Sequence, residues 1–107
     1  MEQEIAEERA LGKDRIEEEG KRIRDDKLRS FEKRLNDMKK NGLSGDAEFE
    51  FADLLAEYGD KVQKVDDEMK AWNAEQSAAL EDKLRQRREK RRREIEEMKK
   101  EREAQLN

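Results

Sequence analysis

The chain has 107 residues, of which 26 are Lys or Arg and 30 are Asp or Glu, so 52% are charged and 32% are hydrophobic. The absence of Cys and His excludes disulfides, thiolate zinc sites and a cysteine nucleophile, and it removes the usual general base. No run approaches the roughly 18 apolar residues of a membrane-spanning helix, and no secretory leader is recognisable, so we expect a cytoplasmic, non-enzymatic protein without a cofactor.

High charge with low hydrophobicity fits either a disordered chain or long exposed helices. The chain has no Pro and few β-branched residues, and strong helix formers dominate throughout. These features favour helices, so the predicted fold class is all-α.

The first predicted segment is residues 1–40, with a helix over about 3–40. Its apolar positions are sparse: Ile5, Ile16, Ile23, Leu28, Phe31, Leu35 and Met38.

The clearest break is at residues 41–46, Asn-Gly-Leu-Ser-Gly-Asp. Gly42 is suited to the left-handed position that ends a helix in a Schellman motif, with Leu43 touching Met38. Ser44 or Asp46 can cap the following helix.

The second predicted helix covers about 47–105 and carries a stripe with alternating spacings of four and three, typical of a coiled coil. The stripe consists of Phe51, Leu55, Tyr58, Val62, Val65, Met69, Trp72, Gln76 and Ala79. It then shifts by one residue to Leu80 and Leu84, and later to Ile95 and Met98, which indicates a stutter.

Folding the chain near residue 44 brings the two stripes together as an antiparallel helical hairpin or coiled coil. This arrangement places Phe31 near Tyr58, Gly20 near Met69, and Ile16 near Trp72. Leu35 falls near both Leu54 and Leu55. We expect residues 47–84 to pair with the first helix and residues 85–107 to protrude as a helical extension.

Weak self-similarity suggests that the extension begins a second copy of the first helix. Asp-Lys-Leu-Arg at 26–29 recurs at 82–85, and Met-Lys-Lys at 38–40 recurs at 98–100. The parent protein would then be an array with a unit of roughly 55–60 residues. The alternative is that these matches arise by chance, because charged residues make up half of the sequence.

Charge is distributed unevenly along the chain. Residues 41–82 contain 3 basic and 12 acidic groups, whereas residues 83–107 contain 11 basic and 6 acidic groups. The acidic middle of one copy and the basic end of the next can attract each other and give head-to-tail order, or the charges can simply keep exposed helices solvated.

A basic run in the extension could contact phosphates. It comprises Arg85, Arg87, Arg88, Lys90, Arg91, Arg92 and Arg93. No aromatic residue lies within ten positions and three glutamates follow at once, whereas nucleic-acid binders often add stacking aromatics. A solvated helix or a charged protein partner is therefore favoured over nucleic acid.

The region around the single tryptophan contains the most specific pattern. Ala56 is followed after seven residues by Lys64 and Val65, then by Met69 and Trp72. This resembles the centrin-binding repeat of spindle-pole and contractile-fibre scaffold proteins, whose pattern is Ala-x7-Leu-Leu-x3-Phe/Leu-x2-Trp-Lys/Arg. The pattern is also similar to the helical repeats of giant ciliate scaffolds that hold spasmin. Lys64 replaces the first Leu, and Asn73 replaces the final basic residue.

The resemblance implies an EF-hand partner whose calcium-opened groove takes up Val65, Met69 and Trp72, with Ala56, Leu80 and Leu84 as further partner-binding residues. The same residues fit the seam of the hairpin, and one stripe cannot occupy both places. The leading hypothesis is a cytoskeletal or contractile-fibre scaffold repeat that docks a centrin- or spasmin-like protein. A self-associating coiled-coil spacer and a basic-helix nucleic-acid binder are the alternatives.

Overall fold

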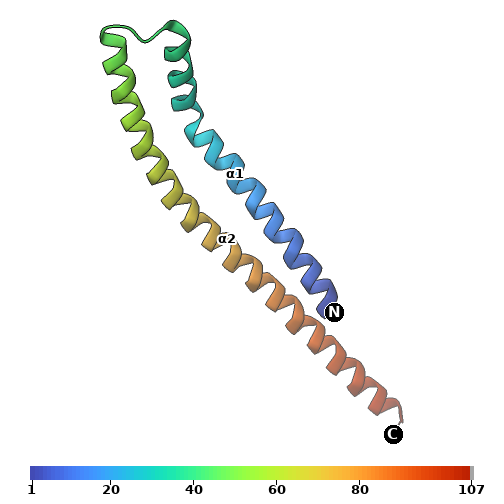
Figure 1. The fold of residues 1–107 in the computed structure, drawn as a ribbon. Helices are drawn as coiled ribbons and strands as arrows, with labels where there is room; N and C mark the ends of the chain where they lie inside the picture. Colours follow the sequence, from blue (N-terminus) through green and yellow to red (C-terminus); the bar gives the residue numbers. More distant parts are fainter. Residues whose placement is uncertain (107) are drawn as a thin grey trace.

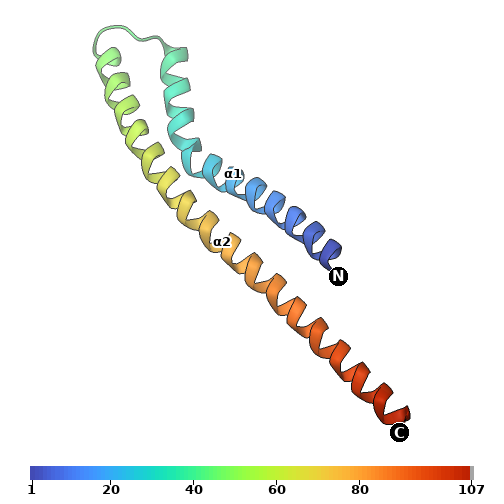
Figure 2. The same ribbon diagram turned by 60° about the horizontal axis from the view of Figure 1, so that its bottom comes forward.

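A computed structural model describes residues 1–106 and contains two helices, α1 (Glu2–Asn41) and α2 (Asp46–Leu106). The helices lie side by side and antiparallel, and α2 continues past the N-terminus (Figure 1). The turned view shows the same arrangement, with both helices gently curved (Figure 2). The predicted all-α hairpin is confirmed, and the helix ends lie within one residue of the predicted ones.

Two glycines make the turn between the helices. Gly42 has φ 92° and ψ 143°, and its N–H donates to the Lys39 carbonyl at 3.3 Å. Gly45 has φ 61°. The Schellman ending predicted at Gly42 is wrong, because its ψ lies outside the left-handed region and no hydrogen bond runs from Leu43 N–H to the Met38 carbonyl within residues 1–106. Both residues nevertheless need the positive φ that glycine tolerates.

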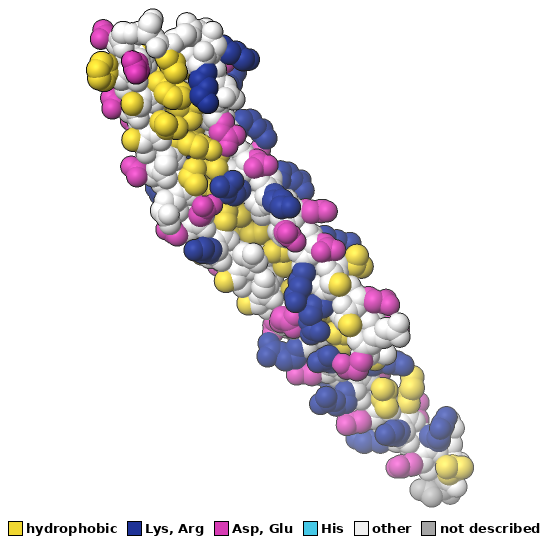
Figure 3. Space-filling model, viewed as in Figure 1, with side chains coloured by type: hydrophobic (Ala, Val, Ile, Leu, Met, Phe, Trp, Pro, Cys, Tyr) yellow, Lys and Arg dark blue, Asp and Glu magenta, His cyan; other side chains and the backbone are white. Residues whose placement is uncertain are grey.

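The core is a single line of side chains between the helices, visible as a yellow stripe in Figure 3. The molecule measures 93 × 20 × 15 Å, so it has no interior beyond this line. The buried hydrophobic residues are Ile5, Leu28 and Leu35 of α1 and Leu54, Val65 and Leu84 of α2.

The predicted register is confirmed at two points. The rings of Phe31 and Tyr58 lie 6.3 Å apart between centroids. A Cβ built on Gly20 would lie 3.7 Å from Met69 Cε and 3.2 Å from Trp72 Cζ3. Trp72 therefore packs on Gly20, a glycine that leaves room for the indole.

The predicted seam is wrong at Leu55, which is 49% exposed, whereas its neighbour Leu54 is 5% exposed. A strict heptad pattern selects Leu55 because it lies four residues after Phe51. In the structure the facing positions step instead by three and four, through Phe51, Leu54 and Tyr58. Leu54 therefore faces α1, and Leu55 lies at the flank of the seam.

The stutter predicted for the second helix is present, and α1 contains a matching one. From Trp72 the α1-facing positions of α2 advance in steps of four through Gln76 and Leu80 to the buried Leu84, and Ala79 is exposed. The facing stretch of α1 also advances in steps of four, from Gly12. Because both helices leave the heptad spacing in the same stretch, their stripes stay in contact there.

The paired region extends beyond the predicted boundary at residue 84. Arg87 pairs with Glu4 and Glu8, and Arg88 pairs with Glu2 at 2.6 Å. These long side chains reach across to the first turns of α1. The helical extension expected over 85–107 is helical through Leu106, and its final residue lies outside the described part of the chain.

Candidate partner-binding site

The tryptophan stripe, formed by Val65, Met69 and Trp72, lies on the α1-facing side of α2. Val65 is fully buried, and Met69 and Trp72 are half-buried. The position opposite them is Gly20, where an added Cβ would lie 3.2 Å from Trp72 Cζ3, in tight contact with the indole edge. The stripe therefore forms part of the hairpin seam, and a partner could reach it only after α1 had moved aside.

Leu80 and Leu84 extend the tryptophan stripe toward the C-terminus. Leu84 is 3% exposed. Leu80 packs on Gly12 so closely that a Cβ there would lie 2.7 Å from Leu80 Cδ1. Ala56 is exposed and does not join the other predicted partner-binding residues. Five of the six residues thus share one face.

Ion pairs to α1 flank the tryptophan stripe. Arg24 Nε donates to Asp66 at 3.0 Å, and Lys27 Nζ donates to Glu68 at 2.6 Å. The hydrogen bond from Lys27 lowers the pKa of Glu68, and the bond to Asp66 raises the pKa of Arg24. Asp66 and Glu68 therefore help to close the hairpin.

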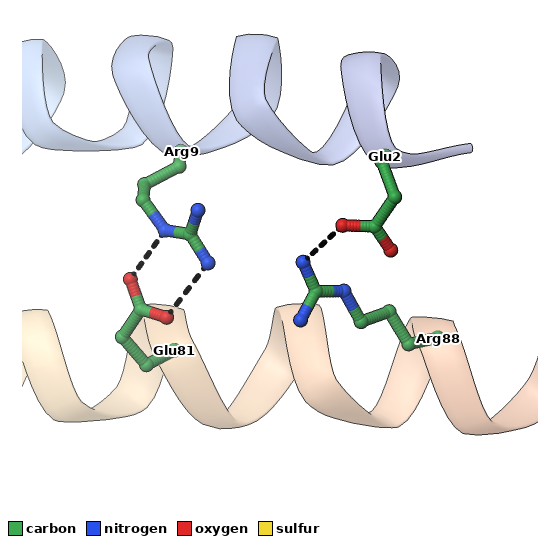
Figure 4. A network of polar contacts seen from close by, with 4 residues as sticks. All are labelled: Glu2, Arg9, Glu81 and Arg88. Carbon is green, nitrogen blue, oxygen red and sulfur yellow. Dashed lines mark hydrogen bonds and ion pairs between the residues drawn. The ribbon is translucent and has the colours of Figure 1, made fainter.

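A second cluster of ion pairs closes the hairpin near its open end (Figure 4). Arg9 binds Glu81 through two hydrogen bonds of 2.7 and 3.1 Å, in a bidentate arrangement. The hydrogen bond from Arg9 lowers the pKa of Glu81. Arg88 reaches Glu2 beside this pair. Sequence spacing alone could not reveal these partners, because they are about 70 residues or more apart in the chain.

The predicted basic run does not form one continuous free patch. Arg87 and Arg88 are engaged by α1 carboxylates, as described above. Arg85 pairs with Asp82, and Arg91 lies 3.5 Å from Glu94 of the same helix. The other members of the run, Lys90, Arg92 and Arg93, are exposed.

The surface hollows between the helices are shallow. The one beside Leu80 and Leu84 is an open groove whose lining includes Leu11, Gly12 and Arg87. Within residues 1–106, no three His, Cys, Asp or Glu side chains converge to hold a metal ion. Neither helix contains, over the same residues, a stretch long and apolar enough to cross a membrane.

Comparisons with known proteins found no matching family model, no similar curated protein and no similar solved structure.

Proposed function

We propose that this chain is a structural, non-catalytic unit of a cytoskeletal or contractile-fibre scaffold. The observation that supports this role is the shape: a rod 93 Å long and 20 × 15 Å in section, held by a seam one side chain wide. A rod of this kind can space other molecules along its length, and its open grooves are poorly suited to enclosing a small substrate.

The proposed partner is an EF-hand protein of the centrin or spasmin type, bound at the tryptophan stripe. Helix-in-groove recognition needs large apolar anchors on one helical face, and Val65, Met69 and Trp72 provide them. In the hairpin α1 covers Met69 and Trp72 only partly, because Gly20 lies opposite them and contributes no side chain.

Docking and hairpin closure then compete for one surface. A partner can bind only the fraction of molecules in which α1 has moved away, and its apparent affinity falls by that fraction. Opening also separates Asp66 from Arg24 and Glu68 from Lys27. The hairpin of the proposed scaffold unit is therefore closed in the absence of the EF-hand protein and open when that protein is bound.

A calcium titration tests the docking. Adding a centrin-type protein with calcium should shift the emission of Trp72 to shorter wavelength, because the indole enters an apolar groove. Calorimetry on the Trp72→Ala variant should show binding weakened at least about tenfold, since large aromatic anchors dominate such interfaces. A matched control is Phe49→Ala, which truncates an exposed aromatic of the same helix and should bind as the native chain does. If the Trp72→Ala variant binds as tightly as the native chain, the tryptophan stripe is not the binding site.

A reversible lock tests whether the hairpin must open. A Cβ on Gly12 would lie 3.3 Å from Leu80 Cγ, the place of the sulfur in Leu80→Cys. Gly12→Cys combined with Leu80→Cys should therefore form a disulfide with little movement, since the S–S bond is about 2.05 Å long. The oxidised variant should not bind the EF-hand protein, and the same sample should bind after reduction. Equal binding in both states would show that the partner sits elsewhere.

Nucleic-acid binding is not proposed, because carboxylates already engage Arg85, Arg87 and Arg88.

A further inference from the structure

Large exposed apolar side chains gather at the two ends of the rod. Hydrophobic side chains are visible near both ends in Figure 3. At the loop end they are Leu43, Phe49 and Leu55; at the other end they are Met1, Ile95, Met98 and Leu106. Between these groups, Leu11 is the one large hydrophobic residue of 1–106 that is similarly exposed. Apolar surface concentrated in this way marks interaction sites.

The tip stripe consists of Asp46, Phe49, Asp53, Ala56 and Asp60. Its spacings of three and four place it on one face of α2, away from the α1-facing residues Phe51, Leu54 and Tyr58. All five residues are exposed, and Phe49 is 74% exposed. Residues 46–60 hold six acidic groups and no basic group, so Phe49 lies in a strongly negative surface.

The tail stripe consists of Arg91, Ile95, Met98 and Arg102. It continues the seam of α2 past the end of α1. Ile95 is 40% exposed and Met98 is 59% exposed. The hollow beside them is lined only by residues of α2 itself, including Arg102 and Lys99. This stretch has the form of a coiled-coil face without a second helix.

The order of residues in the tail stripe argues against pairing two tails. The stripe reads cation, apolar, apolar, cation, and this order is the same in both directions. Two tails aligned on their apolar residues would bring arginine against arginine, whether parallel or antiparallel. Like charges at facing positions are destabilising. Two tips would likewise bring aspartates together, so an attractive contact requires unlike ends.

We propose that the tail stripe of one copy binds the tip stripe of a second copy, so that the rods join head to tail. Rods in line place the two α2 segments parallel. With Arg91 opposite Asp46, Ile95 falls opposite Phe49, so the first charged pair and the first apolar pair coincide. Further along, Met98 and Arg102 fall near Asp53 and Ala56, in the strongly negative surface of the tip.

This contact deepens the structural role proposed above by naming a partner, a second copy of the chain. It joins two different surfaces, so each bound pair keeps a free tip and a free tail. Such heterologous contacts grow into open filaments and do not close as dimers. The overlap of residues 89–106 is about 27 Å long at 1.5 Å per residue. Because the contact is short and charged, high concentration and low salt favour assembly.

Sedimentation of the full chain over a range of concentrations tests the proposal. At low salt the average mass should rise past twice the 12.8 kDa monomer without a plateau, and high salt should reduce it. Phe49→Lys blocks the tip, and Met98→Glu blocks the tail. Each variant alone should remain monomeric, but their mixture should form a one-to-one dimer that grows no further. Leu11→Glu, in the middle of the rod, should assemble as the native chain does.

Three results would overturn the head-to-tail contact. They are a native chain that stays monomeric, one that stops at a dimer, and a mixture of the two blocked variants that does not associate. The test contains no EF-hand protein, so its failure leaves the docking site to be judged by the titration. Circular dichroism of the same samples separates the two proposals further. Helical monomers would contradict the head-to-tail contact but not the structural role. An unfolded chain would contradict the structural role itself.

Discussion

The glycines within the helices differ in what surrounds them. Gly59 has no atom within 4 Å of a built Cβ, whereas the Cβ of Gly20 would approach the Trp72 indole to 3.2 Å. Glycine costs a helix interior about 0.5–1 kcal/mol relative to alanine. Gly59 therefore only weakens α2, while Gly20 makes room for the tryptophan.

Two alanine substitutions separate these roles. Gly59→Ala should raise the free energy of unfolding by about 0.5–1 kcal/mol, because helix propensity is the only change. Gly20→Ala should raise it by less, because the indole must move, and should shift the emission of Trp72. Urea unfolding followed by circular dichroism measures both. Equal stabilisation by the two substitutions would show that Gly20 is not a packing site.

Two carboxylates link hairpin stability to pH. Hydrogen bonds from Lys27 and Arg9 lower the pKa of Glu68 and Glu81 in the folded chain. A carboxyl whose folded pKa is lowered stabilises the fold above its unfolded pKa, near 4.5, and this contribution is lost as pH falls through the folded value.

The double variant Glu68→Gln with Glu81→Gln should consequently be less stable than the native chain at pH 7. The gap between the two proteins should narrow as pH falls below about 4, where the native carboxylates also become neutral. Urea midpoints from pH 7 to pH 3 measure this. Glu103→Gln, in the part of α2 beyond α1, should leave the midpoint unchanged at every pH. A gap that stays constant with pH would contradict the assignment.

At the scale of the helices, the seam is so narrow that the rotation of α2 about its own axis decides which of its residues are buried. Leu54 and Leu55 are chemically identical neighbours, yet only Leu54 is buried. The two leucines therefore form a matched pair for testing which face of α2 meets α1.

Leu54→Ala should cost about 2–4 kcal/mol of unfolding free energy, as truncation of a buried leucine does. Leu55→Ala should cost less than about 1 kcal/mol, because half of its side chain already faces water. Thermal unfolding of both variants provides the comparison. If Leu55→Ala lowers the unfolding free energy more than Leu54→Ala does, then Leu55 faces α1, as the strict heptad pattern predicts.

The helices also show which charges can be paired by spacing alone. A spacing of four predicts Glu81 with Arg85 and Asp25 with Arg29. In the structure Arg85 pairs with Asp82 and Arg29 with Asp26, three residues away. Glu81 instead turns across the interface to Arg9. For Arg85, the bond between Arg9 and Glu81 thus leaves Asp82 as the acidic partner on its own helix.

For the whole molecule, the distribution of contacts predicts two independent parts. The hairpin holds all six buried hydrophobic residues, and residues 95–106 are exposed without exception. The extension therefore depends on helix propensity and on charge pairs within its own helix, and it contributes little to the hairpin.

Truncation after Glu94 should leave the urea midpoint of the hairpin unchanged within error. The same truncation removes most of the tail stripe, including Ile95 and Met98, so it should abolish any head-to-tail assembly. Circular dichroism and sedimentation of the shortened chain measure the two effects separately. A marked fall in the midpoint would mean that the extension stabilises the hairpin.

The two helices and the turn between them follow from local features of the sequence. Helix propensity is local, and the glycines at 42 and 45 interrupt it where the chain must reverse. The approximate register also follows from the sequence, since Phe31 meets Tyr58 and Gly20 meets Met69 once the chain folds at that turn.

Which of two adjacent residues faces the other helix depends on how the whole hairpin packs, and local sequence does not reveal it. The packing of the two helices selects Leu54 over Leu55, and it carries the pairing past residue 84 to Arg88. The physical reason is that the relative rotation of two curved helices depends on all their contacts together. A rotation of a fraction of a turn leaves local propensity unchanged but exchanges buried and exposed neighbours.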